Sequence, residues 1–210
     1  MENLKELDIS NTNIVSGGAS YYDGYTTKNN IIGTYMFSGL SNLEQIKTPQ
    51  SITAIYSYAF GGCISLTEYV FTERIREIGT AAFFNCQSLK SAIIPSNITM
   101  IRYNAFAGCE NLKSVTFSDS DEEIFVDTPF IQCPIETIYV GRNIKYYEFD
   151  GSPFAYLTTL KDVTLSKHAF LTISGWMSIC FRCIIQNLKR VTCVTDSFND
   201  MTQWWNKKKS

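Results

Sequence analysis

Two stretches of the sequence decide its fold: Ala59-Phe-Gly-Gly-Cys-Ile-Ser-Leu-Thr and Ala105-Phe-Ala-Gly-Cys-Glu-Asn-Leu-Lys-Ser-Val-Thr-Phe. Both contain Ala-Phe-x-x-Cys-x-x-Leu, and the phenylalanine recurs along the chain at intervals of 23 or 24 residues. It occupies Phe37, Phe60, Phe83, Phe106, Phe130 and Phe154. A period of this length is typical of solenoids, whose single copies cannot bury their own apolar face and are stabilised by stacking on their neighbours.

Each repeat combines two periodicities. With the phenylalanine as position 1, positions 10 and 12 are apolar and alternate with polar residues in most copies, which predicts a half-buried strand. The three-residue spacing of Ala-Phe-x-x-Cys-x-x-Leu predicts a short helical turn. Isoleucines at positions 16 and 19, such as Ile98 and Ile101, are expected to point inward. We therefore predict an α/β repeat solenoid of about seven or eight coils, with parallel strands about 4.8 Å apart on one side and short helical turns on the other.

The repeats define the domain organisation. Residues 3–9 match positions 6 to 12, so a first coil is present, and residues 16–30 interrupt it with three glycines and three tyrosines. We expect this insertion to protrude as a loop. Residues 1–195 are predicted to form one repeat domain. The pattern is lost in residues 196–210, which are predicted to be a C-terminal cap or a disordered tail.

Composition excludes several classes of function. The 210 residues carry 18 Lys and Arg against 20 Asp and Glu, which does not produce the broad positive field of a nucleic-acid-binding protein. The single histidine, His168, disfavours most acid/base, nucleophilic and zinc mechanisms. Apolar runs stay shorter than the roughly 18 residues of a spanning helix. We expect no enzymatic activity, no cofactor, no nucleic-acid partner and no direct insertion of this chain into a membrane.

The two stretches quoted first, together with Ile93-Ile-Pro-Ser-Asn-Ile-Thr-Met-Ile, closely resemble the BspA-like leucine-rich repeat, also called the Treponema pallidum type. The resemblance covers about residues 3–193. Ile138-Tyr-Val-Gly-Arg-Asn-Ile followed by Gly151-Ser-Pro-Phe resembles a divergent copy found in such proteins of gut Bacteroidetes. The resemblance implies a right-handed leucine-rich-repeat superhelix and supplies no catalytic residues.

The same resemblance implies a location and a class of partner. It points to a cell-surface or secreted protein that adheres to host matrix proteins or to other bacterial surface proteins. Family members usually begin with a signal sequence, whereas this chain opens inside a repeat and shows no signal peptide. We therefore expect a fragment of a longer protein.

Four cysteines occupy position 4 of the repeat, where other copies have Leu40 and Leu157. Because leucine fills the same slot, we predict buried free thiols rather than metal or disulfide chemistry. These cysteines are Cys63, Cys86, Cys109 and Cys133.

Three other motifs are interpreted as packing or solvent features. Cys180-Phe-Arg-Cys183 has the spacing of a redox or zinc pair, but the sequence has no second such pair; packing is favoured and a local disulfide or redox pair stays open. His168 is expected at a surface turn. The acidic run of residues 119–123 lacks the pattern of a calcium loop and is interpreted as a solvated turn.

The outward positions of the strands remain as the candidate functional surface. Aligned across coils, they form a broad mixed-charge face with some apolar content, which suits a protein ligand. The residues predicted to bind are Glu44, Lys47, Thr67, Glu68, Lys90, Lys113, Thr116 and Lys161. The tyrosine-rich insertion, Tyr146 and Tyr147 could add aromatic anchors. Two alternatives stay open: a structural spacer in a larger surface protein, and the recognition arm of a secreted enzyme.

Overall fold

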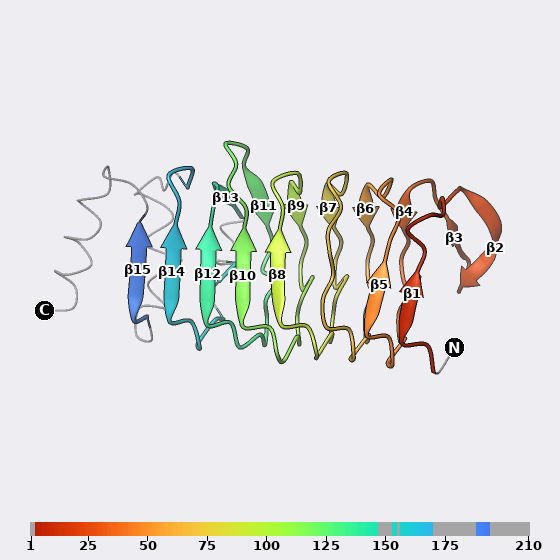
Figure 1. The fold of residues 1–210 in the computed structure, drawn as a ribbon, viewed down its shortest axis with the longest axis horizontal. Coiled ribbons are helices and arrows are strands. Elements are labelled where there is room, and N and C mark those ends of the chain that lie inside the picture. Colours follow the sequence, from red (N-terminus) through yellow and green to blue (C-terminus); the bar gives the residue numbers. More distant parts are fainter. Residues whose placement is uncertain (1–2, 147–152, 155, 170–187, 194–210) are drawn as a thin grey trace, which may run out of the picture.

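The chain winds into an elongated solenoid in a computed structural model that describes residues 3–146, 153–154, 156–169 and 188–193. Its strands run across the long axis, with β1 (Glu6–Asp8) and β15 (Arg190–Cys193) at opposite ends (Figure 1). The predictions for Tyr147, Cys180, Cys183 and residues 196–210 concern parts of the chain outside the described residues.

The first layer consists of parallel strands at the predicted positions 9 to 12. It is divided into a two-stranded sheet, β1–β5, and a five-stranded sheet in the order β15–β14–β12–β10–β8. Equal repeat positions lie in register, so that Val115 pairs with Ala92. Val115 also pairs with Ile138, which is position 9 of its copy because that copy is one residue shorter before the strand. The remaining strands of this layer are β5 (Gln45–Lys47), β8 (Ser91–Ile94), β10 (Ser114–Phe117), β12 (Thr137–Val140) and β14 (Asp162–Leu165). We call its solvent-facing side, including the segment 67–72, the strand face.

A second parallel sheet forms the opposite layer, and the sequence analysis did not predict it. Its strands are short, and each buries an apolar residue such as Ile55 or Ile78, the predicted inward position 19. The order is β13–β11–β9–β7–β6–β4. Six strands in this layer correspond to about six complete turns in the described chain, fewer than the seven or eight expected. The strands are β4 (Ile31–Ile32), β6 (Ala54–Ile55), β7 (Glu77–Ile78), β9 (Met100–Ile101), β11 (Ile124–Val126) and β13 (Ile144–Lys145).

The prediction of short helical turns was wrong, because the described residues contain no helix. Two residues per coil adopt positive φ on either side of the phenylalanine, for example Tyr58 at 54° and Gly62 at 76°. A left-handed residue cannot continue a right-handed helix. The equivalent pairs are Tyr35 and Gly39, Ala81 and Asn85, Asn104 and Gly108, and Thr128 and Gln132. Accordingly, the described part of the chain has no helix that could cross a bilayer.

The turns use their amides across coils instead. The Phe60 N–H donates to the Ala82 carbonyl of the next coil at 2.8 Å, and the Gly62 N–H donates to Phe84 in the same way at 2.8 Å. Only the intervening amides close local turns, as when the Cys63 N–H donates to the Phe60 carbonyl at 3.1 Å. The turn side is therefore a ladder between coils, and the three-residue spacing reflects successive turns.

The recurrent phenylalanines form the central stack of the core. The ring centroids of Phe60 and Phe83 are 5.1 Å apart, and those of Phe83 and Phe106 are 5.2 Å apart with planes inclined by 4°. These distances are close to the spacing between neighbouring strands. Both layers thus close over one continuous row of rings, which explains why each coil needs a phenylalanine in the same place.

The insertion in the first coil forms an antiparallel hairpin of β2 (Gly17–Tyr22) and β3 (Tyr25–Thr27), turned at Asp23 and Gly24. It projects from the β1–β4 end of the solenoid (Figure 1). The Tyr21 hydroxyl donates to the Thr34 carbonyl at 2.9 Å and ties the hairpin to the following coil.

Candidate interaction surface

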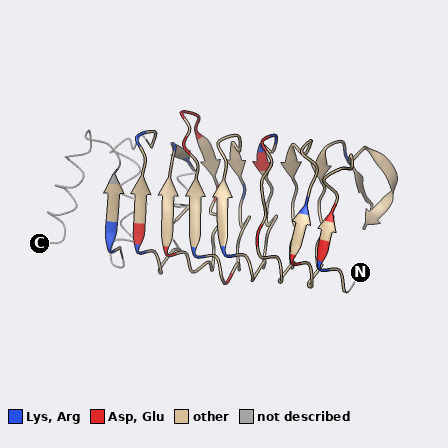
Figure 2. Ribbon diagram, in the orientation of Figure 1, with Lys and Arg blue, Asp and Glu red and all other residues tan. Residues whose placement is uncertain are grey.

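The predicted binding residues all lie at positions 8, 9 or 11 of the repeat, on the strand face or at its margin. Lys47, Glu68, Lys90 and Lys113 are exposed. Glu44, Thr67, Thr116 and Lys161 are half-buried. Figure 2 shows charged residues gathered near the lower ends of the strands, and the middle of the sheet from β8 to β12 is free of charge.

Most charges along this margin neutralise one another. Lys5 pairs with Glu44 at 2.8 Å, and Glu136 accepts both Lys113 at 3.3 Å and Lys161 at 2.5 Å. Hydrogen bonds from Lys161 and Lys113 hold the pKa of the Glu136 carboxyl below its usual value. Because these pairs are solvent-exposed, they contribute little to stability and mainly set the local charge pattern.

Lys90 and Glu68 lie between the paired residues of the margin. Neither forms an ion pair with any residue in the described part of the chain, and Glu6 and Lys189, near the two ends of the margin, form no ion pair with a described residue either. Thr67, Lys90 and Lys113 instead border a common hollow together with Ser88 and Asn111. The structure thus brings three of the predicted residues together around one uncompensated ammonium group.

The centre of the strand face carries two exposed aliphatic side chains that the site prediction left out. Val70 is 74% exposed and Ile93 is 62% exposed, and both occupy the outward position 11. An apolar residue at an outward position of the alternating pattern is the sequence signal that identifies them. They border one hollow and form an apolar spot within an otherwise polar surface, and Lys90 lies three residues before Ile93 in the same coil.

The sheet is interrupted at this spot. No ladder joins β5 to β8, and the segment 68–71 between them forms no backbone hydrogen bond with either strand. Figure 1 shows this coil crossing between β5 and β8 without a strand arrow. The interruption coincides with Tyr69 at position 10, where the residues in register in the other described coils are Leu, Ile, Ala or Val.

Tyr69 accounts for the interruption by its volume. Its ring packs 5.2 Å from Phe60, 5.2 Å from Phe83 and 4.9 Å from Phe71, and it is almost completely buried. Its hydroxyl lies 3.0 Å from Thr48 Oγ1, and burial raises the pKa of the phenol. An oversized side chain in a close-packed slot displaces the backbone. The displaced strand leaves hollows of about 300 Å³ towards β5 and about 190 Å³ towards β8.

The cysteines of position 4 take no part in this surface. Their burial is confirmed, and all four are free. Each thiol donates to a phenylalanine carbonyl of the preceding coil, as Cys63 does to Phe37 at 3.1 Å and Cys109 to Phe83 at 3.3 Å. Burial raises the pKa of the Cys63 thiol to about 12. The slot therefore selects cysteine for its size and for this hydrogen bond.

The acidic run of residues 119–123 is fastened to neighbouring coils. His168 Nδ1 lies 2.7 Å from an oxygen of Asp121, which is itself 88% exposed, and the Tyr139 hydroxyl donates to Asp119 at 2.8 Å. Below the run, the buried Arg142 donates to the Pro95 and Ser96 carbonyls. His168 is thus half-buried in a loop contact, and no described cluster of His, Cys, Asp and Glu could hold a metal ion.

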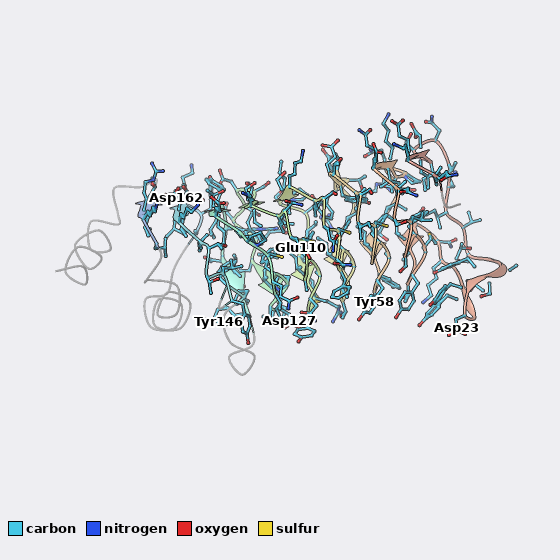
Figure 3. All side chains as sticks on the ribbon, turned by 90° about the horizontal axis from the view of Figure 1, so that it is seen from below. Asp23, Tyr58, Glu110, Asp127, Tyr146 and Asp162 are labelled. Carbon is cyan, nitrogen blue, oxygen red and sulfur yellow. The ribbon has the colours of Figure 1, made fainter. Side chains whose placement is uncertain are left out.

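The tyrosines expected as extra anchors lie elsewhere. Figure 3 places Asp23, at the tip of the hairpin, and Tyr146 on the side of the solenoid opposite Asp162 of the strand face. The Tyr22 and Tyr25 rings of the hairpin pack against Tyr35 of the following coil, with ring centroids 4.9 and 6.0 Å apart. They therefore do not extend the strand face.

The stacked coils, the phenylalanine row and the exposed strand face define a β-solenoid of the leucine-rich-repeat class. The sequence matches the family model "BspA type Leucine rich repeat region" in six copies, over residues 30–161 and 89–200, and the chain belongs to this family. Leucine-rich repeat proteins typically mediate protein interactions and are generally non-enzymatic. The resemblance stated from the sequence is confirmed.

Solved structures are similar to the chain as well. A leucine-rich repeat protein of T. pallidum matches with a TM-score of 0.55 and 19% identity, over 89% of this chain and 80% of that one. A leucine-rich repeat protein from Bacteroides ovatus matches with a TM-score of 0.39 and 16% identity, over 90% of this chain and 69% of that one. A leucine-rich cell surface protein from Faecalibacterium prausnitzii matches with a TM-score of 0.35 and 17% identity, over 97% of this chain and 62% of that one. The T. pallidum likeness supports the fold alone, and comparison with curated proteins gave no match.

Proposed function

We propose that this chain is a non-enzymatic interaction module of a cell-surface or secreted protein, and that it binds a protein ligand through the strand face. One observation carries the proposal: an exposed apolar spot of Val70 and Ile93 is surrounded by polar and charged side chains. Protein-binding surfaces typically combine an apolar centre with a polar rim. The ligand class that we propose is a host matrix protein or a surface protein of another bacterium.

The charge arrangement of the margin supports this role. Because Glu44 and Glu136 already neutralise three lysines, the strand face has a patterned charge of modest magnitude. Such a pattern favours the orientation and selection of a partner over strong non-specific attraction. Lys90 has no carboxylate partner in the described part of the chain, so its ammonium group is available for a ligand carboxylate.

The thiols of the core are compatible with an extracellular location. A free cysteine outside the cell is at risk of oxidation, and the reactive species is the thiolate. Burial raises the pKa of Cys63, Cys86 and Cys109, so their thiolates are disfavoured in the folded chain. We also propose that residues 1–195 act as one repeat domain, with residues 196–210 as its cap or tail.

Binding to purified host matrix proteins and bacterial surface proteins, immobilised as a panel, tests the proposal. We expect saturable binding that the double variant Lys90→Glu, Lys113→Glu weakens. The double variant Lys28→Glu, Arg74→Glu is the matched control, because it makes the same charge change at two exposed residues outside the strand face. Equal loss in the control would indicate a net-charge effect, and no binding across the panel would favour a structural spacer.

A further inference from the structure

We propose that the interruption between β5 and β8 is the docking point for the partner, and that it takes an extended segment with an apolar side chain next to an acidic one. This inference rests on the proposed function and narrows it to one place on the strand face. The docking point consists of Val70, Ile93, Lys90 and the two hollows beside Val70.

The interruption leaves backbone groups available. An interior strand of a parallel sheet forms hydrogen bonds with both neighbours. By the register of the intact coils, Tyr69 would lie between Ile46 and Ala92, and its segment would bond to both β5 and β8. Since the segment 68–71 forms neither set of bonds, N–H and C=O groups of three adjacent coils border the hollows. An extended ligand can satisfy such groups with its own amides or side chains.

The hollows beside Val70 differ in character. The one towards β8 is bordered by Val70, Phe71, Ile93 and Pro95, and it suits an aliphatic or aromatic side chain. The one towards β5 is bordered by Gln45, Lys47, Gln50 and Glu68, and it suits a hydrogen-bonding side chain. Because the apolar hollow is small, it selects a side chain rather than a broad apolar surface.

The charges indicate where the acidic residue binds. Glu68 borders both hollows and would repel a carboxylate placed there, and Lys47, which borders the hollow towards β5, already pairs with Asp8 at 3.5 Å. The neighbouring hollow is bordered by Lys90 and Lys113 and has no acidic residue in its lining. An acidic side chain next to the apolar one therefore meets the unpaired Lys90, and this complementarity fixes the direction of the segment.

The size of the apolar spot argues for a peptide segment rather than a second copy of this chain. A stable protein dimer buries on the order of 800 Å² per partner with an apolar centre. Two exposed aliphatic side chains in a mixed-charge face provide far less apolar area than that. A short segment that inserts one side chain requires only the spot itself.

A displayed library of random linear decapeptides, selected on the full chain, is the probe. We expect enriched peptides to share an apolar residue adjacent to Asp or Glu. Val70→Lys and Lys90→Glu should each weaken binding of an enriched peptide by about tenfold or more. Thr164→Lys makes the matched change at position 11 of an uninterrupted coil and should leave the affinity within about twofold.

Tyr69→Val tests the cause of the site, because valine is the residue of position 10 in regular coils. We expect the variant to form the missing ladder, to slow hydrogen exchange of the amides of residues 68–71, and to weaken the same peptide. If Tyr69→Val does not fold, the comparison of Val70→Lys with Thr164→Lys still decides the question.

Several outcomes would overturn the docking point. One is an enriched peptide that Val70→Lys and Tyr69→Val leave unaffected while Lys161→Glu abolishes its binding; the strand face would then still bind a ligand, elsewhere. The absence of any enriched peptide also overturns it. Binding to the panel of purified proteins then tests the proposed function separately. Concentration-dependent dimerisation that Val70→Lys abolishes would identify a second copy as the occupant.

Discussion

The coil that begins at Phe60 and the coil that begins at Phe106 have the same repeat pattern but different backbones. Both bury a phenylalanine at position 1 and a cysteine at position 4, and both have a phenylalanine at position 12, where Phe117 is buried and Phe71 is half-buried. The coil of Phe106 forms β10, paired on both sides, whereas the coil of Phe60 forms no strand in the first layer. Position 10 is Val115 in the coil of Phe106 and Tyr69 in the coil of Phe60. The comparison indicates that side-chain volume at one inward position decides whether a coil joins the sheet.

The largest effects are expected from the phenylalanine stack. Phe106→Ala and Phe83→Ala each remove a buried ring, and we expect each to lower the free energy of unfolding by about 3–5 kcal/mol. Phe83→Ala should cost less, because Tyr69 and Phe71 contact the Phe83 ring and can move into the cavity. Urea denaturation checks both values. A larger loss for Phe83→Ala would contradict the idea that the interrupted coil can relax.

Transferring the oversized residue should transfer the interruption. We expect Val115→Tyr to lower the free energy of unfolding by about 1–3 kcal/mol, because it overpacks a regular coil. The amides of β10 should then exchange faster with solvent, while those of β14 keep their protection. Hydrogen exchange measured by NMR checks this. Val115→Ile, a smaller increase at the same position, is the control and should leave the β10 ladder intact.

These comparisons show which parts of the fold can be predicted from the sequence. The repeat period, the strands of the first layer and the buried cysteine slot follow from spacing alone. The turn side does not, because a spacing of three residues fits a helix and a run of turns equally well. The deciding feature is the positive φ of residues such as Tyr58 and Ala81. Their side chains do not favour that conformation, so the sequence does not signal it. The second sheet escaped prediction because its strands are too short to show alternation.

The candidate site could be predicted only in part, for the same reasons. Position 8 holds Glu44, Thr67, Lys90 and Lys113 in successive coils, and Glu136 takes the next place in register. A lysine without an adjacent carboxylate can therefore be recognised at Lys90. The hollows depend on how far the Tyr69 ring displaces its strand. That displacement depends on packing against Phe60 and Phe83, and the linear pattern does not contain it.

The thiols test whether the interruption reaches the turn side. Cys63 and Cys109 are both buried and donate to the coil before them, so we expect equally slow alkylation in the folded chain. Because burial raises the pKa of Cys63 to about 12, the folded state binds this proton more tightly than the unfolded state. Stability from this group is complete below about pH 9 and declines as the pH rises towards 12. Mass spectrometry after maleimide labelling checks the first point, and faster labelling of Cys63 would show that the interruption spreads through the coil.

The smallest effect is expected at the charged margin, where Lys113 and Lys90 occupy the same position in neighbouring coils. Lys113→Gln removes one partner of Glu136, so the lowered pKa of that carboxyl should rise towards its usual value. Lys90→Gln should leave the Glu136 titration unchanged, because Lys90 pairs with no described carboxylate. Since the pKa of Glu136 is lowered in the folded state, its stabilising contribution is present above the unfolded pKa and is lost as the pH falls through the folded value. Carboxyl-detected NMR titration of both variants decides this, and an equal shift in both would mean that Lys90 also interacts with Glu136.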